Sequence, residues 1–351
     1  MAIGKNKVIL QIMKTIENYS LLNNNTFGVD VNARYFIEYD SVDELQYLLR
    51  SDLLQENKFF HIGGGSNLLF INDYEGVILH SKIKGIDAIE GTRSVVVLKV
   101  GAGETWDSFV EYCVSKNYGG VENLSGIPGE VGATPVQNIG AYGAEAANVI
   151  CAVECIDVKT GMEKIFTAKE CEFGYRDSIF KRSLKGKYIV TYVHFKLQKT
   201  GWEPNVNYGS LKDEFAKYPE QNIAAVRSAV LAIRGRKLPE PKVLGNAGSF
   251  FMNPVVPVSK FNELKSTYPD IPSYPVSEKK VKLAAGWLIE QCGWKGKSVG
   301  PVAVHGSQAL VLINKGGANG LDIINLSDSI RASVREKFGV ELIPEVNIIF
   351  G

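Results

Sequence analysis

The chain has 351 residues, of which 45% are hydrophobic, and this length predicts two or three domains with substantial cores. Its 39 Lys and Arg residues balance 38 Asp and Glu residues, and the net charge of +1 argues against a nucleic-acid partner. No apolar stretch approaches the roughly 20 residues that span a bilayer, so we expect a cytoplasmic protein without a membrane partner.

The first third of the chain predicts alternating helices and strands. Apolar residues at helical spacing follow a capping serine in residues 41–52, and apolar runs predict strands at 59–64 and 76–80. A further strand is predicted at 94–103 and an amphipathic helix at 105–117. Three adjacent glycines between the first two strands are a poor choice for a regular element, because they pack no side chain.

The middle third predicts a long ordered loop followed by an antiparallel sheet. Gly and Pro recur too often for regular structure in residues 123–149, yet the segment contains no Asp or Lys and does not resemble a solvated linker. Strands are predicted at 152–158, 162–168 and 187–197. A helix over 222–238 should stop before Pro239.

The last third predicts a mixed α/β segment. We expect a helix over 279–293, a strand over 309–314 and a helix over 327–339. Residues 340–350 read as a final strand that is buried in a core. The fold class is therefore α/β or α+β.

Several common catalytic motifs are absent from the sequence. Leu68 stands where a nicotinamide-binding G-x-G-x-x-G loop needs its third glycine, and Gln291 stands at the first glycine of a P-loop. Ala247 and Phe251 replace the glycines of a serine-hydrolase G-x-S-x-G turn. The five cysteines include no C-x-x-C pair and the four histidines are scattered, so we expect no metal site and no disulfide framework.

Two glycine-rich segments could hold a nucleotide cofactor. Consecutive N–H groups at Gly63–Gly65 can form an anion-binding nest, with Ser66 and Asn67 adding hydrogen bonds to a diphosphate. Glycines between residues 125 and 143 would let backbone approach a large flat ligand, while Gln137 and Asn138 offer amide groups. Either segment alone reads as a structural turn, whereas the two together favour a nucleotide cofactor.

Three further residues allow both a structural and a chemical interpretation. Arg176 lies among aromatic and apolar residues and could simply pair with Asp177. Glu345 stands in the apolar run "IPEVNII", where a carboxylate needs either an ion pair or a role in proton delivery. Ser249, in a glycine-bordered turn, could cap its own backbone or act in catalysis.

The sequence resembles the UDP-N-acetylenolpyruvoylglucosamine reductases, flavoenzymes that complete UDP-N-acetylmuramate for bacterial cell-wall synthesis. The resemblance is carried by seven segments in the family's order: "NTFGVDVNARYF", "IGGGSNLLF", "SGIPGEVGATPVQNIGAYGAE", "FGYRDSIFK", "KLPEPKVLGNAGSFFMNP", "AGWLIEQCGWKG" and "LIPEVNII". It implies an α+β fold with a two-part FAD-binding domain of the vanillyl-alcohol-oxidase type and a smaller α/β substrate-binding domain. The implied bounds are FAD-binding subdomains at 1–88 and 89–236, a substrate domain at 237–338, and a strand at 339–351 that returns to the FAD-binding domain.

The resemblance also implies which residues contact FAD. The diphosphate would be held by the glycine loop, and the loop at 125–143 would wrap the rest of the cofactor beside its ring system. The implied contacts are Gly63, Gly64, Gly65, Ser66, Asn67, Ser125, Gly126, Ile127, Pro128, Gly129, Gly132, Gln137, Asn138, Gly140, Ala141, Tyr142, Gly143, Arg176 and Arg234.

The implied catalytic residues are Arg176, Ser249 and Glu345. NADPH would reduce the flavin, which would pass hydride to the enolpyruvyl group of UDP-N-acetylglucosamine enolpyruvate. Arg176, paired with Glu345, would stabilise the developing enolate. Ser249 would protonate the carbanionic carbon, a step that requires fixed geometry and exclusion of water.

The implied substrate contacts are Tyr208, Lys237 and Asn253, which would grip the diphosphate of the sugar nucleotide and of NADPH in turn, and Gln308. The stretch "WEPNVNYGSL" at 202–211 resembles the family subgroup with a tyrosine-bearing loop over the active site. Ala133 and Thr134 depart from the usual glycine and alanine. We expect a monomer that takes part in cell shape, cell division and the cell cycle through peptidoglycan synthesis.

Two other readings remain open. The chain could be an alcohol or sugar oxidase of the same flavin fold, with FAD attached through a histidine, although His61 precedes the glycines, where such a link is unexpected. It could also be a nucleotide-binding protein that has lost catalysis. The joint presence of Arg176, Ser249 and Glu345 argues against this second reading.

Overall fold

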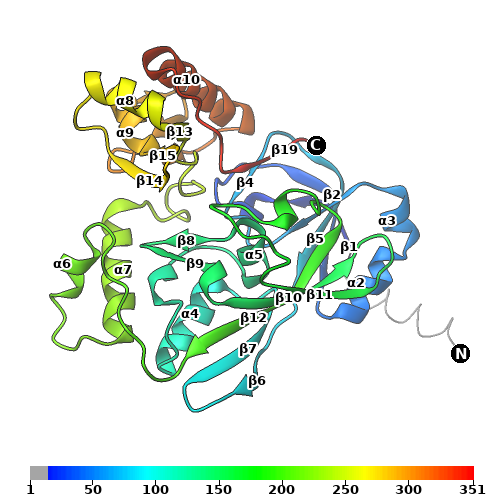
Figure 1. The fold of residues 1–351 in the computed structure, drawn as a ribbon. Helices are drawn as coiled ribbons and strands as arrows, with labels where there is room; N and C mark the ends of the chain where they lie inside the picture. Colours follow the sequence, from blue (N-terminus) through cyan, green and yellow to red (C-terminus); the bar gives the residue numbers. More distant parts are fainter. Residues whose placement is uncertain (1–14) are drawn as a thin grey trace, which may run out of the picture. The chain divides into compact units, whose positions relative to one another are not determined.

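The computed structural model describes residues 15–351, which form two compact units (Figure 1). Unit 1 combines the residues up to Tyr19 with Ala33–Gly64 and Glu75–Arg236, and unit 2 combines Ser20–Asn32, Gly65–Tyr74 and Lys237–Gly351. Residues 1–14 lie outside the described residues. Within residues 15–351, no helix has the length and apolar character needed to cross a membrane.

A four-stranded sheet with two short helices forms the first part of unit 1. Its strand order is β1-β2-β5-β3, and β3 runs parallel to β5. Ser41 caps α2 by accepting a hydrogen bond from the N–H of Glu44 at 3.2 Å, as its sequence position predicts. Helix residues such as Leu45 and Leu54 pack in one core with Val77 of the sheet. The elements are β1 (Thr15–Ser20), β2 (Asn32–Tyr39), β3 (Phe59–Ile62), β5 (Tyr74–Ser81), α2 (Val42–Leu49) and α3 (Asp52–Glu56).

The second part of unit 1 is an antiparallel five-stranded sheet in the order β11-β10-β12-β7-β6 (Figure 1). Its strands are β6 (Ile86–Gly91), β7 (Val95–Gly101), β10 (Ile150–Asp157), β11 (Glu163–Thr167) and β12 (Tyr188–Gln198). Val96, Leu98 and Val100 alternate toward one face, where they share a core with Trp106 and Phe109 of α4 (Trp106–Ser115). Period-two alternation in the strands and helical spacing in α4 therefore build this layer as predicted.

The predicted loop at 123–149 contains short elements within unit 1: η2 (Glu122–Leu124), η3 (Val131–Ala133), α5 (Thr134–Gln137), β8 (Gly140–Ala141), β9 (Ala144–Glu145) and η4 (Ala146–Asn148). After η5 (Ile179–Lys181) and β12 come α6 (Leu211–Phe215) and α7 (Ile223–Lys237), which pack together through Leu211, Phe215 and Val226. Residues 123–149 therefore form an ordered series of short helices, strands and turns, as predicted.

Unit 2 contains three small sheets and three longer helices. β4 (Leu68–Phe70) pairs in parallel with the carboxy-terminal strand β19 (Asn347–Ile349), and the other two sheets have the orders β13-β15-β14 and β16-β17-β18. The aromatic rings of Tyr268, Trp287 and Phe338 pack against one another. The remaining elements are η1 (Leu22–Asn24), β13 (Val255–Pro257), α8 (Val258–Thr267), β14 (Ser273–Ser277), β15 (Lys280–Leu283), α9 (Ala285–Gln291), β16 (Ser298–Val299), β17 (Val302–Val304), β18 (Leu312–Asn314) and α10 (Gly320–Phe338).

Four predicted elements of unit 2 are wrong in extent. The helix expected at 327–339 begins earlier, at Gly320 of α10, and the strand expected at 309–314 is confined to β18. The expected helix at 279–293 is the strand β15 followed by α9, because Val281 and Leu283 alternate with lysines at the period of a strand. The expected final strand at 340–350 is confined to β19, and Glu345 precedes it. Ile343 is 56% exposed, so the apolar run is not a continuous buried strand.

The implied domain bounds at 88, 236 and 338 stay predictions. One of these implied bounds, at 236, coincides with a boundary between the two observed units, which lies between Arg236 and Lys237. Residues 20–32 and 65–74, which fall in the predicted subdomain 1–88, make their contacts within unit 2, as does the carboxy-terminal strand.

Candidate functional site

The first half of the glycine loop lies against the loop at 125–143 within unit 1. A Cβ atom on Gly64 would stand 3.1 Å from the Cα of Gly129, and one on Gly63 would stand 3.3 Å from Oε2 of Glu130. Gly64 therefore approaches the backbone of Gly129 and Gly63 approaches the side chain of Glu130, so a side chain at either glycine would be crowded. The cradle of N–H groups expected at these glycines stays a prediction.

The second half of the glycine loop belongs to unit 2. Gly65 adopts φ +64°, and a Cβ there would overlap the carbonyl oxygen of Asn24. Asn67 donates from Nδ2 to the carbonyl oxygen of Glu345 at 3.2 Å and accepts from the N–H of Asn347 at 3.0 Å. The end of the loop is thus joined directly to the carboxy-terminal segment that carries Glu345.

Ser249 and Glu345 lie on paired backbone segments in unit 2. The N–H of Glu345 donates to the carbonyl oxygen of Phe250 at 2.7 Å, and Phe251 forms an antiparallel bridge with Pro344. The rings of Phe250 and Phe251 are buried and hold this pairing in place. Ninety-five residues separate Ser249 from Glu345 in the sequence, and the fold pairs the backbone segments that carry them.

Arg176 lies against the 125–143 loop in unit 1. Its Nη2 donates to the carbonyl oxygen of Gly140 at 2.6 Å, and a Cβ on Gly140 would stand 2.9 Å from its Nη1. The residue adopts φ +54°, a left-handed conformation that is costly for a side chain of this size. Backbone strain of this kind concentrates at functional sites.

Some predicted cofactor contacts use their side chains to build the loop. The amide of Asn138 donates to Oε2 of Glu145 and to the carbonyl oxygen of Gly174, and its Oδ1 accepts from Ala147. The hydroxyl of Ser125 donates to the carbonyl oxygen of Glu122 at 2.6 Å. The other predicted contacts at 125–143 also lie in unit 1: Ile127, Pro128, Gly132, Gln137, Ala141, Tyr142 and Gly143.

Asp107 fixes the turn at the start of this loop, a role that the sequence analysis missed. Its Oδ1 accepts from the N–H of Gly126 at 2.6 Å, and its carboxylate receives two hydrogen bonds from Arg227 at 2.7 and 2.9 Å. Arg234 lies seven residues farther along α7, where its Nε would be 3.1 Å from a Cβ on Gly126. Burial lowers the pKa of Arg234, and the nearby Tyr142 and Asp107 oppose this shift.

Replacing Asp107 with asparagine is expected to lower the free energy of unfolding by about 1–3 kcal/mol, toward the low end because the carboxylate is 35% exposed. Burial opposes ionisation, but Arg227 and the N–H of Gly126 outweigh it and hold the pKa of Asp107 below its ordinary 3.8. The stability that the ionised Asp107 carboxylate contributes is therefore present above pH 3.8, and it is lost as the pH falls through the folded-state pKa.

Urea unfolding of wild type and Asp107→Asn at neutral and acid pH measures this difference. The difference in the free energy of unfolding between the two proteins should become smaller at acid pH. Asp328→Asn, which removes an exposed ion pair to Arg331, is the matched control and should change stability little. A gap that stays constant with pH would show that the carboxylate charge is not what stabilises the turn.

The tyrosine-bearing loop at 202–211 is anchored to the 119–143 region in unit 1. Trp202 donates from Nε1 to Glu122 at 2.8 Å, and Nδ2 of Asn123 donates to the carbonyl oxygens of Asn205 and Tyr142. The rings of Tyr142 and Tyr208 pack edge to face, with 6.4 Å between the ring centroids. Tyr208 is half exposed, so its hydroxyl-bearing ring remains accessible.

Asn253 and Gln308 each lie near the start of α9 in unit 2. Oδ1 of Asn253 accepts from the N–H of Ala285 at 2.9 Å, and Oε1 of Gln308 lies 3.3 Å from where Gly286 would carry a Cβ. Lys237 is exposed at the end of α7 and is the first residue of this unit's last segment. Asn253 and Gln308 therefore each lie near the first residues of α9.

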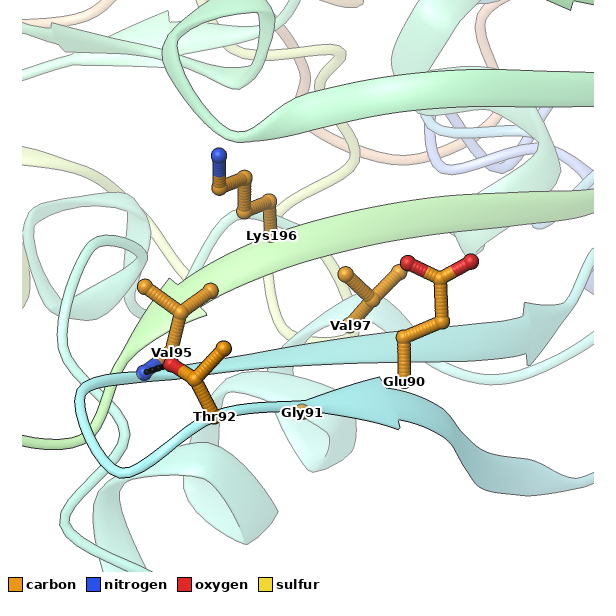
Figure 2. Close-up of a pocket in the computed structure, with 6 residues that line it drawn as sticks. All are labelled: Glu90, Gly91, Thr92, Val95, Val97 and Lys196. Atoms are coloured by element: carbon orange, nitrogen blue, oxygen red, sulfur yellow. Dashed lines mark hydrogen bonds between the residues drawn. The ribbon is translucent and has the colours of Figure 1, made fainter.

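A surface pocket elsewhere in unit 1 contains none of the predicted residues. Figure 2 shows Glu90, Thr92, Val95, Val97 and Lys196 around it, from β6, β7, their connecting turn and β12. Val95 and Val97 form its apolar part, and the ends of Glu90 and Lys196 flank it in Figure 2. This pocket therefore gives no support to the predicted site.

Comparison with known proteins identifies both parts of the chain. A model of an FAD-binding domain matches residues 33–165, and a model of the carboxy-terminal domain of UDP-N-acetylenolpyruvoylglucosamine reductase matches residues 240–349. A UDP-N-acetylenolpyruvoylglucosamine reductase of Bacteroides fragilis is 53% identical over 95% of this chain and 99% of its own. One of Flavobacterium johnsoniae is 45% identical over 96% of this chain and 100% of its own.

A solved structure supports the fold. The UDP-N-acetylenolpyruvylglucosamine reductase of Thermus caldophilus superposes with a TM-score of 0.66 at 23% identity, covering 96% of this chain and 98% of its own. The predicted α+β class is confirmed. The chain belongs to the UDP-N-acetylenolpyruvoylglucosamine reductase family and is an oxidoreductase with an FAD-binding domain.

Proposed function

We propose that the protein reduces the enolpyruvyl ether of UDP-N-acetylglucosamine enolpyruvate to UDP-N-acetylmuramate, with NADPH as the electron donor. One observation carries the proposal: Ser249 and Glu345 lie on paired segments, and Asn67 of the glycine loop bonds to the segment that holds Glu345. The pairing supports the proposal because it links the proposed proton donor and carboxylate to the loop that is proposed to bind the cofactor. The names of the relatives support the choice of substrate.

The residues at the glycine loops fit FAD. Gly64 lies close to Gly129, so that a side chain at Gly64 would be crowded, and Arg234 lies beside Gly126. Bound there, FAD would accept hydride from NADPH and deliver it to the terminal carbon of the enolpyruvyl group. The loop residues would bind the diphosphate through N–H groups, as glycine nests do.

The proposed chemistry divides between a cation and a proton donor. Hydride addition leaves negative charge on the carbon next to the ether oxygen and on its carboxylate. Arg176 would stabilise that charge, with Glu345 as its acidic partner. Ser249 would then donate its hydroxyl proton to the carbanionic carbon, and the fixed backbone on either side would orient that hydroxyl.

The proposed substrate contacts are Tyr208, Lys237, Asn253 and Gln308. Lys237 would pair with a diphosphate, and the ring of Tyr208 would cover the bound nucleotide from its anchored loop. Oδ1 of Asn253 accepts a hydrogen bond from the N–H of Ala285, and its Nδ2 would donate to the ligand. The same groups would hold NADPH and the sugar nucleotide in turn. The proposal includes a monomer acting in the cytoplasm on the path to peptidoglycan.

A coupled turnover assay tests the proposal. The purified protein is mixed with NADPH and UDP-N-acetylglucosamine enolpyruvate, NADPH absorbance is followed, and the sugar nucleotide is analysed by mass spectrometry. Equimolar loss of NADPH and gain of two hydrogens by the sugar nucleotide are expected. NADPH loss that depends on oxygen, with the nucleotide unchanged, would instead favour an oxidase. No turnover with FAD bound would favour a non-catalytic relative.

A further inference from the structure

A buried histidine bridges two carboxylates beneath the first half of the glycine loop. Nδ1 of His80 lies 3.0 Å from Oε1 of Glu38, and Nε2 lies 2.8 Å from Oε1 of Glu130. The His80 side chain is 6% exposed and that of Glu130 is 14% exposed. Glu130 is the one acidic residue in the sequence between positions 125 and 143, and its Oε2 lies beside Gly63.

The proton count of this cluster follows from its geometry. Lys82 lies 3.0 Å from Glu38; burial opposes ionisation, but Lys82 and His80 outweigh it and hold the pKa of Glu38 below its ordinary value. Ionised Glu38 only accepts, so Nδ1 of His80 must donate. Nε2 then either donates to ionised Glu130 or accepts from protonated Glu130. In both cases the His80–Glu130 pair carries no net charge.

Two further titratable groups near the pair, His61 and Tyr39, are neutral at neutral pH. His61, on the strand beside His80, contacts the hydroxyl of Tyr39 at 2.7 Å through Nε2. Burial, together with the nearby His80, lowers the pKa of His61 to about 3. Burial, assisted by Glu130, raises the pKa of the Tyr39 hydroxyl. Among the described neighbours, compensation of Glu130 therefore falls to His80.

We propose that His80 is a positioning residue that neutralises Glu130, so that the backbone cradle at Gly63 and Gly64 can accept the anionic diphosphate of FAD. This inference rests on the proposed function of the glycine loop. Without His80, an ionised carboxylate would lie under the N–H groups that face the ligand. Like charges that lie close together in a partly desolvated site repel strongly.

The test measures FAD affinity of the apoprotein, by quenching of flavin fluorescence, for wild type and three variants. His80→Gln should weaken binding by about tenfold or more, because the charge of ionised Glu130 would no longer be neutralised. Glu130→Gln should bind about as tightly as wild type. The double variant His80→Gln/Glu130→Gln should recover most of the lost affinity, and the deficit of His80→Gln alone should shrink at high salt.

The outcomes separate the two proposals. Rescue by the double variant supports charge compensation, because a merely structural defect would persist when Glu130 is also changed. A double variant as weak as His80→Gln, or a His80→Gln protein with unchanged affinity, would overturn the inference and leave the site intact. Wild-type apoprotein that does not bind FAD would overturn the proposed function itself.

Discussion

Replacing Ser249 with alanine is expected to slow reoxidation of the reduced flavin by the enolpyruvyl substrate about 10²- to 10⁴-fold, while reduction by NADPH keeps its wild-type rate. The hydroxyl would be needed only when the carbanionic carbon takes up its proton. The variant should fold normally, because the neighbouring Phe250 and Phe251 are buried and their backbone pairing does not involve the hydroxyl. Stopped-flow measurement of each half-reaction separates the two steps.

The matched control is Ser329→Ala in α10, whose hydroxyl bonds to the carbonyl oxygen of Asn325 in its own helix. It should leave both half-reactions unchanged. Equal slowing of both half-reactions in Ser249→Ala would assign the serine to cofactor binding or folding and remove it from proton transfer.

Replacing Arg176 with alanine is expected to slow the substrate half-reaction about 10²- to 10³-fold, the usual effect of losing one donor to a developing oxyanion. Arg176→Lys keeps the charge but loses the planar fork, so its rate should fall between those of alanine and wild type. The rate of flavin reoxidation at saturating substrate is the measurement, because it separates catalysis from substrate affinity.

Arg182→Ala is the control for this series. Arg182 lies six residues away and forms surface ion pairs with Glu172 and Asp177. Its loss should alter the reoxidation rate little. If Arg176→Ala and Arg182→Ala behaved alike, Arg176 would be a structural residue of its loop and the strained backbone at φ +54° would need another explanation.

Local sequence patterns were sufficient for the elements that place the glycine loops. Apolar residues alternate along β7 and recur at helical spacing in α4, and in each element they form a single buried face. The capping residue Ser41 indicates the start of α2. Patterning failed at 279–293, where lysines alternate with Val281 and Leu283 before a short helix, and the combined segment has no single period. Such junctions are ambiguous until the pairing of β15 with two other strands is known.

The site was only partly accessible from the sequence. Ser249 and Glu345 were singled out as separate positions, but Glu345 was placed inside a strand, whereas its backbone bonds to Phe250 just ahead of β19. That pairing joins segments far apart in the chain, so no local period reports it. Asp107 was missed because it reads as an ordinary acidic residue in the first turn of α4.

The sequence around Glu130 contains a feature that could have indicated its buried partner. It is the single acidic side chain in a segment with glycine at five positions, and such a charge needs a partner if it is buried. The partner, His80, lies on β5, fifty residues earlier, and nothing in its own neighbourhood distinguishes it from a core histidine. Only the fold brings the two together.

The visible spectrum of the purified protein under anaerobic conditions tests the central claim most directly. The account predicts a flavin absorbance that bleaches with NADPH and returns when UDP-N-acetylglucosamine enolpyruvate is added. A spectrum that bleaches but recovers only with oxygen would contradict the substrate, and a protein that holds no flavin after reconstitution with FAD would contradict the assignment of the glycine loops.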